Sequence, residues 1–94
     1  MKIIKRSGKE VLFDKAKIEA AVSKANITVM ESERLSETEI QKIAAEIETR
    51  CNDANHAVDV ETIQDWVELE IMQYGKYSVA KNYITYRYER SLLR

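Results

Sequence analysis

The first eighteen residues constrain the fold most, because the spacing of apolar residues changes from strand-like to helical within them. Two short runs, Ile3–Arg6 and Glu10–Phe13, mix β-branched or aromatic residues with polar ones and flank Ser7-Gly8. Such a pattern predicts a β-hairpin in which Gly8 supplies the positive φ of the turn. From Asp14 onward the apolar residues recur at helical spacing. We therefore expect a hairpin over residues 2–13, followed directly by a helix.

Helix signals then continue to the end of the chain. Asp14 has the position of an N-cap, and Ser36 with Glu39 forms a capping box before the second helix. Asp59 begins the third helix, and Gly75 ends it as a C′ residue. The pattern predicts a mainly α, α+β fold in which the N-terminal β-hairpin caps a four-helix bundle. The expected single domain spans residues 1–94, with helices at about 15–25, 36–52, 59–74 and 78–92.

The composition excludes several classes of protein. A hydrophobic fraction of 45% and a charged fraction of 33% are those of a soluble globular domain, and no apolar run approaches the roughly 18 residues of a membrane span. The single cysteine, Cys51, rules out an internal disulfide and favours a cytoplasmic protein. It lies on the apolar stripe of the second helix, so we expect a buried small side chain. His56 has no ligand partners, so no metal site is expected.

Charge is distributed unevenly along the chain. Residues 1–17 contain six basic and two acidic side chains, and residues 76–94 contain five and one. The middle, residues 18–75, contains four basic and thirteen acidic side chains. If the two ends meet, they form one positive patch on an acidic body. This arrangement favours a small anionic ligand and makes a nucleic-acid surface unlikely.

The clearest candidate for an anion site surrounds the start of the first helix. Lys17 lies in the first helical turn, where unpaired N–H groups already carry partial positive charge, and Lys5 and Arg6 lie on the adjacent strand. This concentration of positive charge favours phosphate binding. The alternative is that these side chains are simply solvated, which is the interpretation we give to Lys15.

The last helix offers a second candidate surface. Tyr83, Arg87 and Arg90 are spaced at 0, +4 and +7, which places them on one helical face. They either stack on a base and bind phosphate, or form a core-edge tyrosine with arginines that pair with the acidic body. The third helix carries carboxylates that we expect to form a solvated face rather than an acid–base pair: Glu61, Asp65, Glu68 and Glu70.

Four stretches together resemble the ATP-cone, a regulatory domain at the N-terminus of many ribonucleotide reductases and inside the bacterial repressor of their genes. Lys5–Gly8 is similar to the family's Lys-Arg-Asp-Gly turn, and Phe13–Ile18 to its Phe-Asp-x-x-Lys-Ile helix start. Val60–Val67 resembles its third-helix pattern, and Val79–Arg87 its closing Val-Ala-x-x-Tyr-Ile-x-Tyr-Arg. The Tyr-Arg-Tyr-Glu-Arg ending looks most like the anaerobic class of reductase.

The resemblance implies a hairpin lid over a four-helix bundle that binds ATP or dATP, with Mg²⁺ bridging the phosphates. It implies that Ile4 or its neighbour contacts the base and that Asp14 lies near the nucleotide at the hairpin-to-helix junction. Ser7 replaces the family's usual Asp, and Val11 replaces a Glu that helps many members fix the nucleoside, which leaves the choice between ATP and dATP open. The expected nucleotide-binding residues are Ile4, Lys5, Arg6, Asp14, Lys17, Ile18, Tyr83, Arg87 and Arg90.

The family also implies allosteric control of overall reductase activity, exerted through a nucleotide-dependent homo-oligomer and the catalytic domain as partner. The sequence contains no catalytic cysteine set, no glycyl-radical segment and no zinc-ribbon cysteines. We therefore expect a regulatory domain, excised from a larger protein or standing alone, that is not itself an enzyme. Two alternatives are a nucleotide-independent helical protein-interaction domain and the ATP-cone fragment of a nucleotide-responsive transcriptional repressor.

Overall fold

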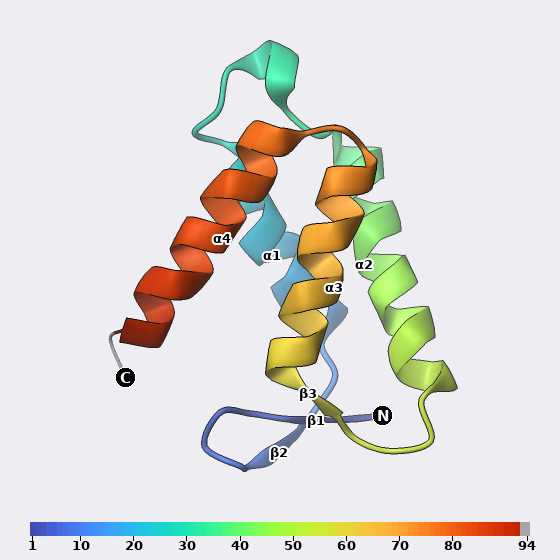
Figure 1. Ribbon diagram of the computed structural model, residues 1–94. Helices are drawn as coiled ribbons and strands as arrows, with labels where there is room; N and C mark the ends of the chain where they lie inside the picture. The colour runs from blue at the N-terminus through green and yellow to red at the C-terminus, as the bar shows by residue number, and fades with distance from the viewer. Residues whose placement is uncertain (93–94) are drawn as a thin grey trace.

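Four helices stand on a small β-sheet in the computed structural model, which describes residues 1–92 (Figure 1). The mainly helical α+β class expected from the sequence is confirmed. The helices are α1 (Lys15–Asn26), α2 (Glu37–Asp53), α3 (Val60–Gln73) and α4 (Tyr77–Leu92). The strands are β1 (Lys2–Ile4), β2 (Glu10–Leu12) and β3 (Val58–Asp59), and a 3₁₀ turn, η1, spans Glu31–Glu33.

The hairpin between β1 and β2 closes through two backbone hydrogen bonds. The Gly8 amide donates to the Lys5 carbonyl at 2.8 Å, and the Lys5 amide donates to the Lys9 carbonyl at 2.9 Å. Gly8 has φ of 87°, the left-handed value that a three-residue hairpin loop needs at its last position. The predicted role of this glycine is confirmed.

A third strand was not expected from the sequence. β3 pairs parallel with β1, with Ile3 opposite Val58 and Ile4 opposite Asp59, so the sheet order is β2-β1-β3. Two residues are too few to show a period of two, and parallel pairing depends on contacts between segments far apart in the chain. The pairing fixes the hairpin directly to the residue that precedes α3.

The helix ends follow the predicted caps. The Asp14 carboxylate accepts from the Ala16 amide at 3.1 Å, and the Ser36 capping box is complete. Asp59 accepts from the Glu61 amide at 3.0 Å, and Gly75 ends α3 with φ of 72°. α1 extends to Asn26 and α4 begins at Tyr77, each one residue beyond the predicted limit.

The core lies between the four helices. Its fully buried large side chains come from every helix: Val22, Ile43, Ile47, Val67, Ile71 and Val79. Cys51 is 3% exposed, as predicted for a side chain on the apolar stripe of α2. No helix within residues 1–92 combines the length and the apolar character needed to cross a membrane.

Candidate functional site

Two adjoining hollows lie beneath the hairpin, between α1, α3 and α4. The basic hollow, of about 280 Å³, takes its name from the five cationic side chains in its wall. The apolar hollow, of about 200 Å³, is bounded mainly by the hairpin strands and the start of α1. The hollows are continuous because they share six residues: Lys5, Lys17, Ala21, Val60, Gln64 and Tyr83.

The apolar hollow combines hydrocarbon walls with one carboxylate. Ile3, Val11 and Phe13 come from the hairpin, and Ile18 comes from the first turns of α1. Asp14 also lines this hollow, and its Oδ1 caps α1 by accepting from a backbone amide. A flat, partly polar ring suits such a site, because the ring buries its faces against apolar side chains and places polar edges near the few polar groups.

Three cations of the basic hollow have no acidic partner among the described residues. Lys5 and Lys17 make no ion pair within residues 1–92. Arg90 donates from Nη1 to the Tyr86 hydroxyl at 3.2 Å and likewise pairs with no carboxylate in that range. These three side chains are available to an anion without first breaking an ion pair.

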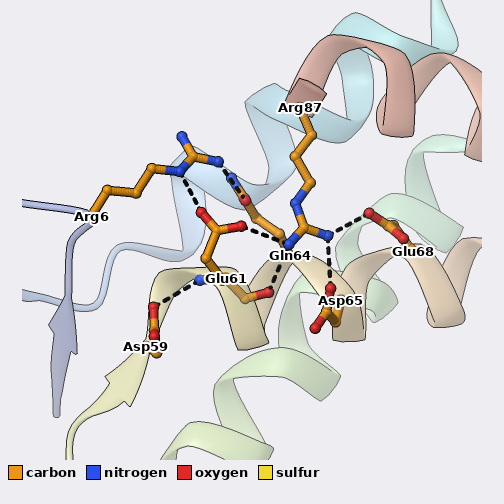
Figure 2. Close-up of polar contacts among 7 residues, drawn as sticks. All are labelled: Arg6, Asp59, Glu61, Gln64, Asp65, Glu68 and Arg87. Atoms are coloured by element: carbon orange, nitrogen blue, oxygen red, sulfur yellow. Dashed lines mark hydrogen bonds and ion pairs between the residues drawn. The ribbon is translucent and has the colours of Figure 1, made fainter. Parts of the chain in front are cut away.

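The other two cations are already engaged with α3, as Figure 2 shows. Arg6, from the hairpin turn, donates from Nε to Glu61 and from Nη2 to the Gln64 side chain at 3.1 Å. Arg87, from α4, donates from Nη2 to Glu61 Oε1 at 2.7 Å. Its Nη1 donates to Asp65 at 2.7 Å and to Glu68 at 2.6 Å. Glu61, Asp65 and Glu68, here called the α3 acid cluster, therefore hold both guanidiniums.

The expectation of a solvated acidic face on α3 holds only in part: the Asp65 and Glu61 side chains are 61% and 43% exposed, whereas Glu68 and Glu70 are largely covered. The hydrogen bond from Arg87, supported by Arg6, holds the pKa of Glu61 below its usual value. Glu70 is buried at 7% exposure and accepts from Arg50 of α2 at 3.0 Å. Desolvation raises the pKa of Glu70, against the attraction of Arg50. The sequence did not show which arginines reach these carboxylates, because Arg6, Arg50 and Arg87 come from the hairpin turn, α2 and α4.

The tyrosines of α4 occupy different depths of the site. Tyr83 lines both hollows and is 5% exposed, and its burial raises its pKa to about 12. Tyr86 lies nearer the surface, where its hydroxyl accepts from Arg90 and from Lys24 of α1 at 3.1 Å. These hydrogen bonds, that from Arg90 first, lower the pKa of Tyr86.

The structure brings most of the expected nucleotide-binding residues to the two hollows. Ile4 lines neither hollow, whereas its neighbour Ile3 lines the apolar one. Asp14 and Ile18 line only the apolar hollow, and Lys15 lines neither. The remaining six expected residues all line the basic hollow: Lys5, Arg6, Lys17, Tyr83, Arg87 and Arg90.

The sequence reasoning missed four residues that line the basic hollow: Ala21, Val60, Gln64 and Tyr86. Ala21 follows Lys17 by four positions, and Gln64 follows Val60 by four, so each pair shares a helical face. Tyr86 is three residues after Tyr83 on α4 and shares its face in the same way. Helical spacing from the residues already chosen would have found two of the four, Ala21 and Tyr86.

The N-terminus of α1 is less available to an anion than its charge suggested. The Ala16 amide is bonded to the Asp14 carboxylate, and the Lys17 amide donates to the Asp14 carbonyl at 3.1 Å. The basic hollow instead meets α1 along its side, at Lys17 and Ala21. An anion in this hollow would meet side-chain cations rather than the free end of the helix.

The donor set does not fit a metal held by protein ligands. Within residues 1–92 no group of three or more His, Cys, Asp or Glu side chains is placed to hold a metal ion. The carboxylates beside the basic hollow are those of the α3 acid cluster, which arginines occupy. Mg²⁺ in proteins commonly retains several waters and is bound largely through the phosphates of its ligand.

The fold is a small helical domain in which two continuous hollows form a pocket with one apolar end and one cationic end. A family model described as ATP cone domain matches residues 1–92. The chain belongs to the ATP-cone domain family.

The proteins similar to this chain are much longer than the chain itself. The chain is 39% identical over 102 residues to the ribonucleoside-diphosphate reductase subunit alpha of Chlamydia muridarum. This alignment covers the whole chain and 10% of that protein. The corresponding subunits of Chlamydia trachomatis and Chlamydia pneumoniae are 37% and 35% identical. The chain thus spans about a tenth of the length of these relatives. These names say nothing of the anaerobic class, so the likeness to it stays a prediction.

Proposed function

We propose that this domain binds ATP or dATP and thereby regulates the overall activity of a ribonucleotide reductase. The observation that carries the proposal is the continuity of an apolar hollow with a hollow walled by five cations, in a chain of the ATP-cone family. An adenine nucleotide has the same division, with a flat base at one end and a chain of negative charges at the other. Each end of the pocket matches one end of the ligand.

The base belongs in the apolar hollow, where Ile3 and Ile18 offer apolar contact and Asp14 offers a carboxylate oxygen to an amino group. The phosphates belong in the basic hollow. Lys5, Lys17 and Arg90 are the first cations to reach them, because none of the three has to leave a carboxylate in the part of the chain described. Mg²⁺ would arrive on the phosphates rather than on protein ligands.

Regulation, in this proposal, is exerted on a catalytic domain that lies outside these residues. The relatives are reductase subunits that match the chain over about a tenth of their length. Allostery requires a second site coupled to this one, and the catalytic domain would provide it through a nucleotide-dependent homo-oligomer. The domain itself performs no catalysis.

Thermal unfolding with and without nucleotide tests the proposal. A ligand at 100 times its dissociation constant stabilises the folded state by about 2.7 kcal/mol, which raises the Tm of a domain of this size by on the order of 10 °C. We expect this rise with ATP or dATP, and we expect Lys17→Ala to remove most of it. No rise with either nucleotide at millimolar concentration would contradict the proposal.

Lys42→Ala is the matched control. Lys42 is an exposed lysine on α2 that lines none of the described hollows. This variant changes the net charge by the same amount as Lys17→Ala, so it should keep the full nucleotide response. An equal loss in both variants would mean that overall charge, and not the basic hollow, attracts the nucleotide.

A second candidate function rests on the outer face of α4. Ile84, Tyr88 and Leu92 follow one another at intervals of four residues and are 39%, 63% and 67% exposed. An exposed apolar stripe of this kind favours protein association. Sedimentation would reveal a dimer whose mass does not depend on nucleotide and that Tyr88→Ala dissociates. A monomer under the same conditions would exclude this candidate.

A further inference from the structure

Glu61 has a connection that no other residue of the α3 acid cluster shares. Its Oε2 accepts from Arg6 of the hairpin turn, and its Oε1 accepts from Arg87 of α4 at 2.7 Å. Its backbone carbonyl also accepts from Arg87, at 3.2 Å. Within residues 1–92, Asp65 and Glu68 form ion pairs with Arg87 only. Glu61 thus joins the hairpin turn to α4 across the first turn of α3 (Figure 2).

The two arginines also form a boundary between opposite charges. Arg6 and Arg87 line the basic hollow, and they line a shallower depression on their other side together with Glu61 and Glu68. The three carboxylates of the α3 acid cluster pair with these two guanidiniums, so the charge of the paired group is net negative. The positive charge that these arginines offer to the basic hollow is therefore largely cancelled from behind.

We propose that Glu61 competes with the phosphates of the bound nucleotide for Arg6 and Arg87, and so sets how tightly the domain binds its ligand. This inference rests on the proposed function. In the empty domain Glu61 holds both guanidiniums, while Lys5, Lys17 and Arg90 receive the incoming phosphates. Arg6 and Arg87 then exchange the carboxylate for phosphate oxygens, because both partners offer charge-assisted hydrogen bonds of similar geometry. Part of the binding free energy is spent on breaking the pairs with Glu61.

The exchange also frees the hairpin turn. The described side-chain hydrogen bonds from the turn to α3 are both made by Arg6, to Glu61 and to Gln64. When Arg6 moves to phosphate, the bond to Glu61 is lost. Occupancy of the basic hollow is in this way linked to the position of the turn.

Calorimetric titration of ATP into Glu61→Gln tests the proposal. The glutamine retains the shape of the side chain but lacks its charge, so Arg6 and Arg87 are held less tightly. We expect ATP to bind roughly two- to fivefold more tightly than to the wild type, the upper part of the range implied by one partly exposed ion pair. The variant should at the same time unfold at a lower temperature when no nucleotide is present. Higher affinity with lower stability distinguishes competition from a purely structural role, which would lower both.

Two matched variants each remove a negative charge but leave Glu61 in contact with both Arg6 and Arg87. Asp65→Asn removes a carboxylate whose one ion pair within residues 1–92 is with Arg87, and Glu46→Gln removes one that pairs with Arg50 on α2. We expect Asp65→Asn to change ATP affinity by less than about twofold, since Asp65 is mostly exposed. Glu46→Gln should leave the affinity unchanged. If either variant tightens binding as much as Glu61→Gln does, general charge explains the effect and the proposal fails.

The arginine Nε–H signals in a nitrogen-15 NMR spectrum report the exchange directly. The Arg6 Nε–H group donates to Glu61 in the empty domain. ATP should shift this signal, and Glu61→Gln should shift it without ATP. If the wild type binds ATP but the signal stays in place, or if Glu61→Gln weakens binding, then Glu61 orients the arginines and does not compete. If the wild type binds no ATP, the proposed function itself fails.

Discussion

α3 is joined to each of its neighbouring helices by an arginine, and the two junctions differ in their surroundings. On the α2 side, Arg50 pairs with Glu70 at 3.0 Å and with Glu46 at 3.3 Å. On the α4 side, Arg87 pairs with all three residues of the α3 acid cluster. The Glu70 side chain is 10% exposed, whereas that of Glu61 is 43% exposed. The first junction is closed, and the second opens onto a pocket.

The carboxylates at the two junctions have pKa values displaced in opposite directions. Burial raises the pKa of Glu70, and the hydrogen bond from Arg87 lowers that of Glu61. A buried carboxylate with one arginine depends on that partner, because leaving it unpaired is costly. A half-exposed carboxylate can exchange its partner for water or for another ion at low cost. The α2 junction therefore cannot lose its arginine without destabilising the fold, and the α4 junction can respond to a ligand.

The largest expected effect comes from breaking the closed junction. Arg50→Ala leaves Glu70 buried without its partner and removes the guanidinium that lies 5.7 Å from the Trp66 ring centre. We expect a loss of about 2–3 kcal/mol in the free energy of unfolding, measured with urea. ATP affinity should not change. The double variant Arg50→Ala with Glu70→Gln should recover much of the loss, and no recovery would show that the charge of Glu70 is not the cause.

Breaking the open junction should lower the free energy of unfolding less, and ATP affinity more, than breaking the closed one. Arg87→Ala leaves three carboxylates close together, but two of them, Glu61 and Asp65, are more than 40% exposed and regain water. We expect a loss of about 1–2 kcal/mol in the free energy of unfolding. ATP affinity should also fall, because one cation of the basic hollow is gone. If Arg50→Ala lowered affinity as much as Arg87→Ala does, the distinction between the two junctions would be lost.

The smallest effect is a difference in pH dependence. The folded-state pKa of Glu61 lies below the usual 4.5. Ionised Glu61 therefore stabilises the fold above pH 4.5, and this stabilisation is lost as the pH falls through the folded-state pKa. The folded-state pKa of Glu70 lies above 4.5. Ionising the buried Glu70 therefore destabilises the fold; this cost is absent below pH 4.5 and grows as the pH rises through the folded-state pKa. Urea unfolding from pH 3 to 7 should therefore show Glu61→Gln flattening the curve below pH 4.5 and Glu70→Gln flattening it above. Equal curves would refute the opposite displacements.

The elements that the sequence predicted well are those with local signals. Gly8 in the turn, Asp14 as a cap and the Ser36 capping box each depend on residues within a few positions, and the structure confirms them. β3 has no such signal, since it consists of two residues that become a strand only against β1. The apolar spacing predicts the helices because burial against neighbours repeats with the helical period.

In the candidate site, too, the sequence predicted which residues take part but not the contacts between residues far apart in the chain. The positive charge at both chain ends indicated which cations would meet, and six of the expected residues line one hollow. The sequence did not indicate that Arg6 and Arg87 share Glu61, since the residues are 55 and 26 positions apart from it. Helical periodicity identifies a face of α3 but not what packs against that face, so the acid cluster was taken as solvated.

The parallel pairing of β1 with β3 has a mechanical consequence. Backbone contacts fix the base of the hairpin at Val58 and Asp59, and Val60 begins α3 without an intervening linker. The opposite end of the hairpin, at Arg6, is held to α3 through side-chain contacts. The hairpin is therefore fixed by backbone pairing at its base and by side-chain contacts at its turn. A displacement of the turn would change the contacts that Arg6 makes with the first turn of α3, where Glu61 lies.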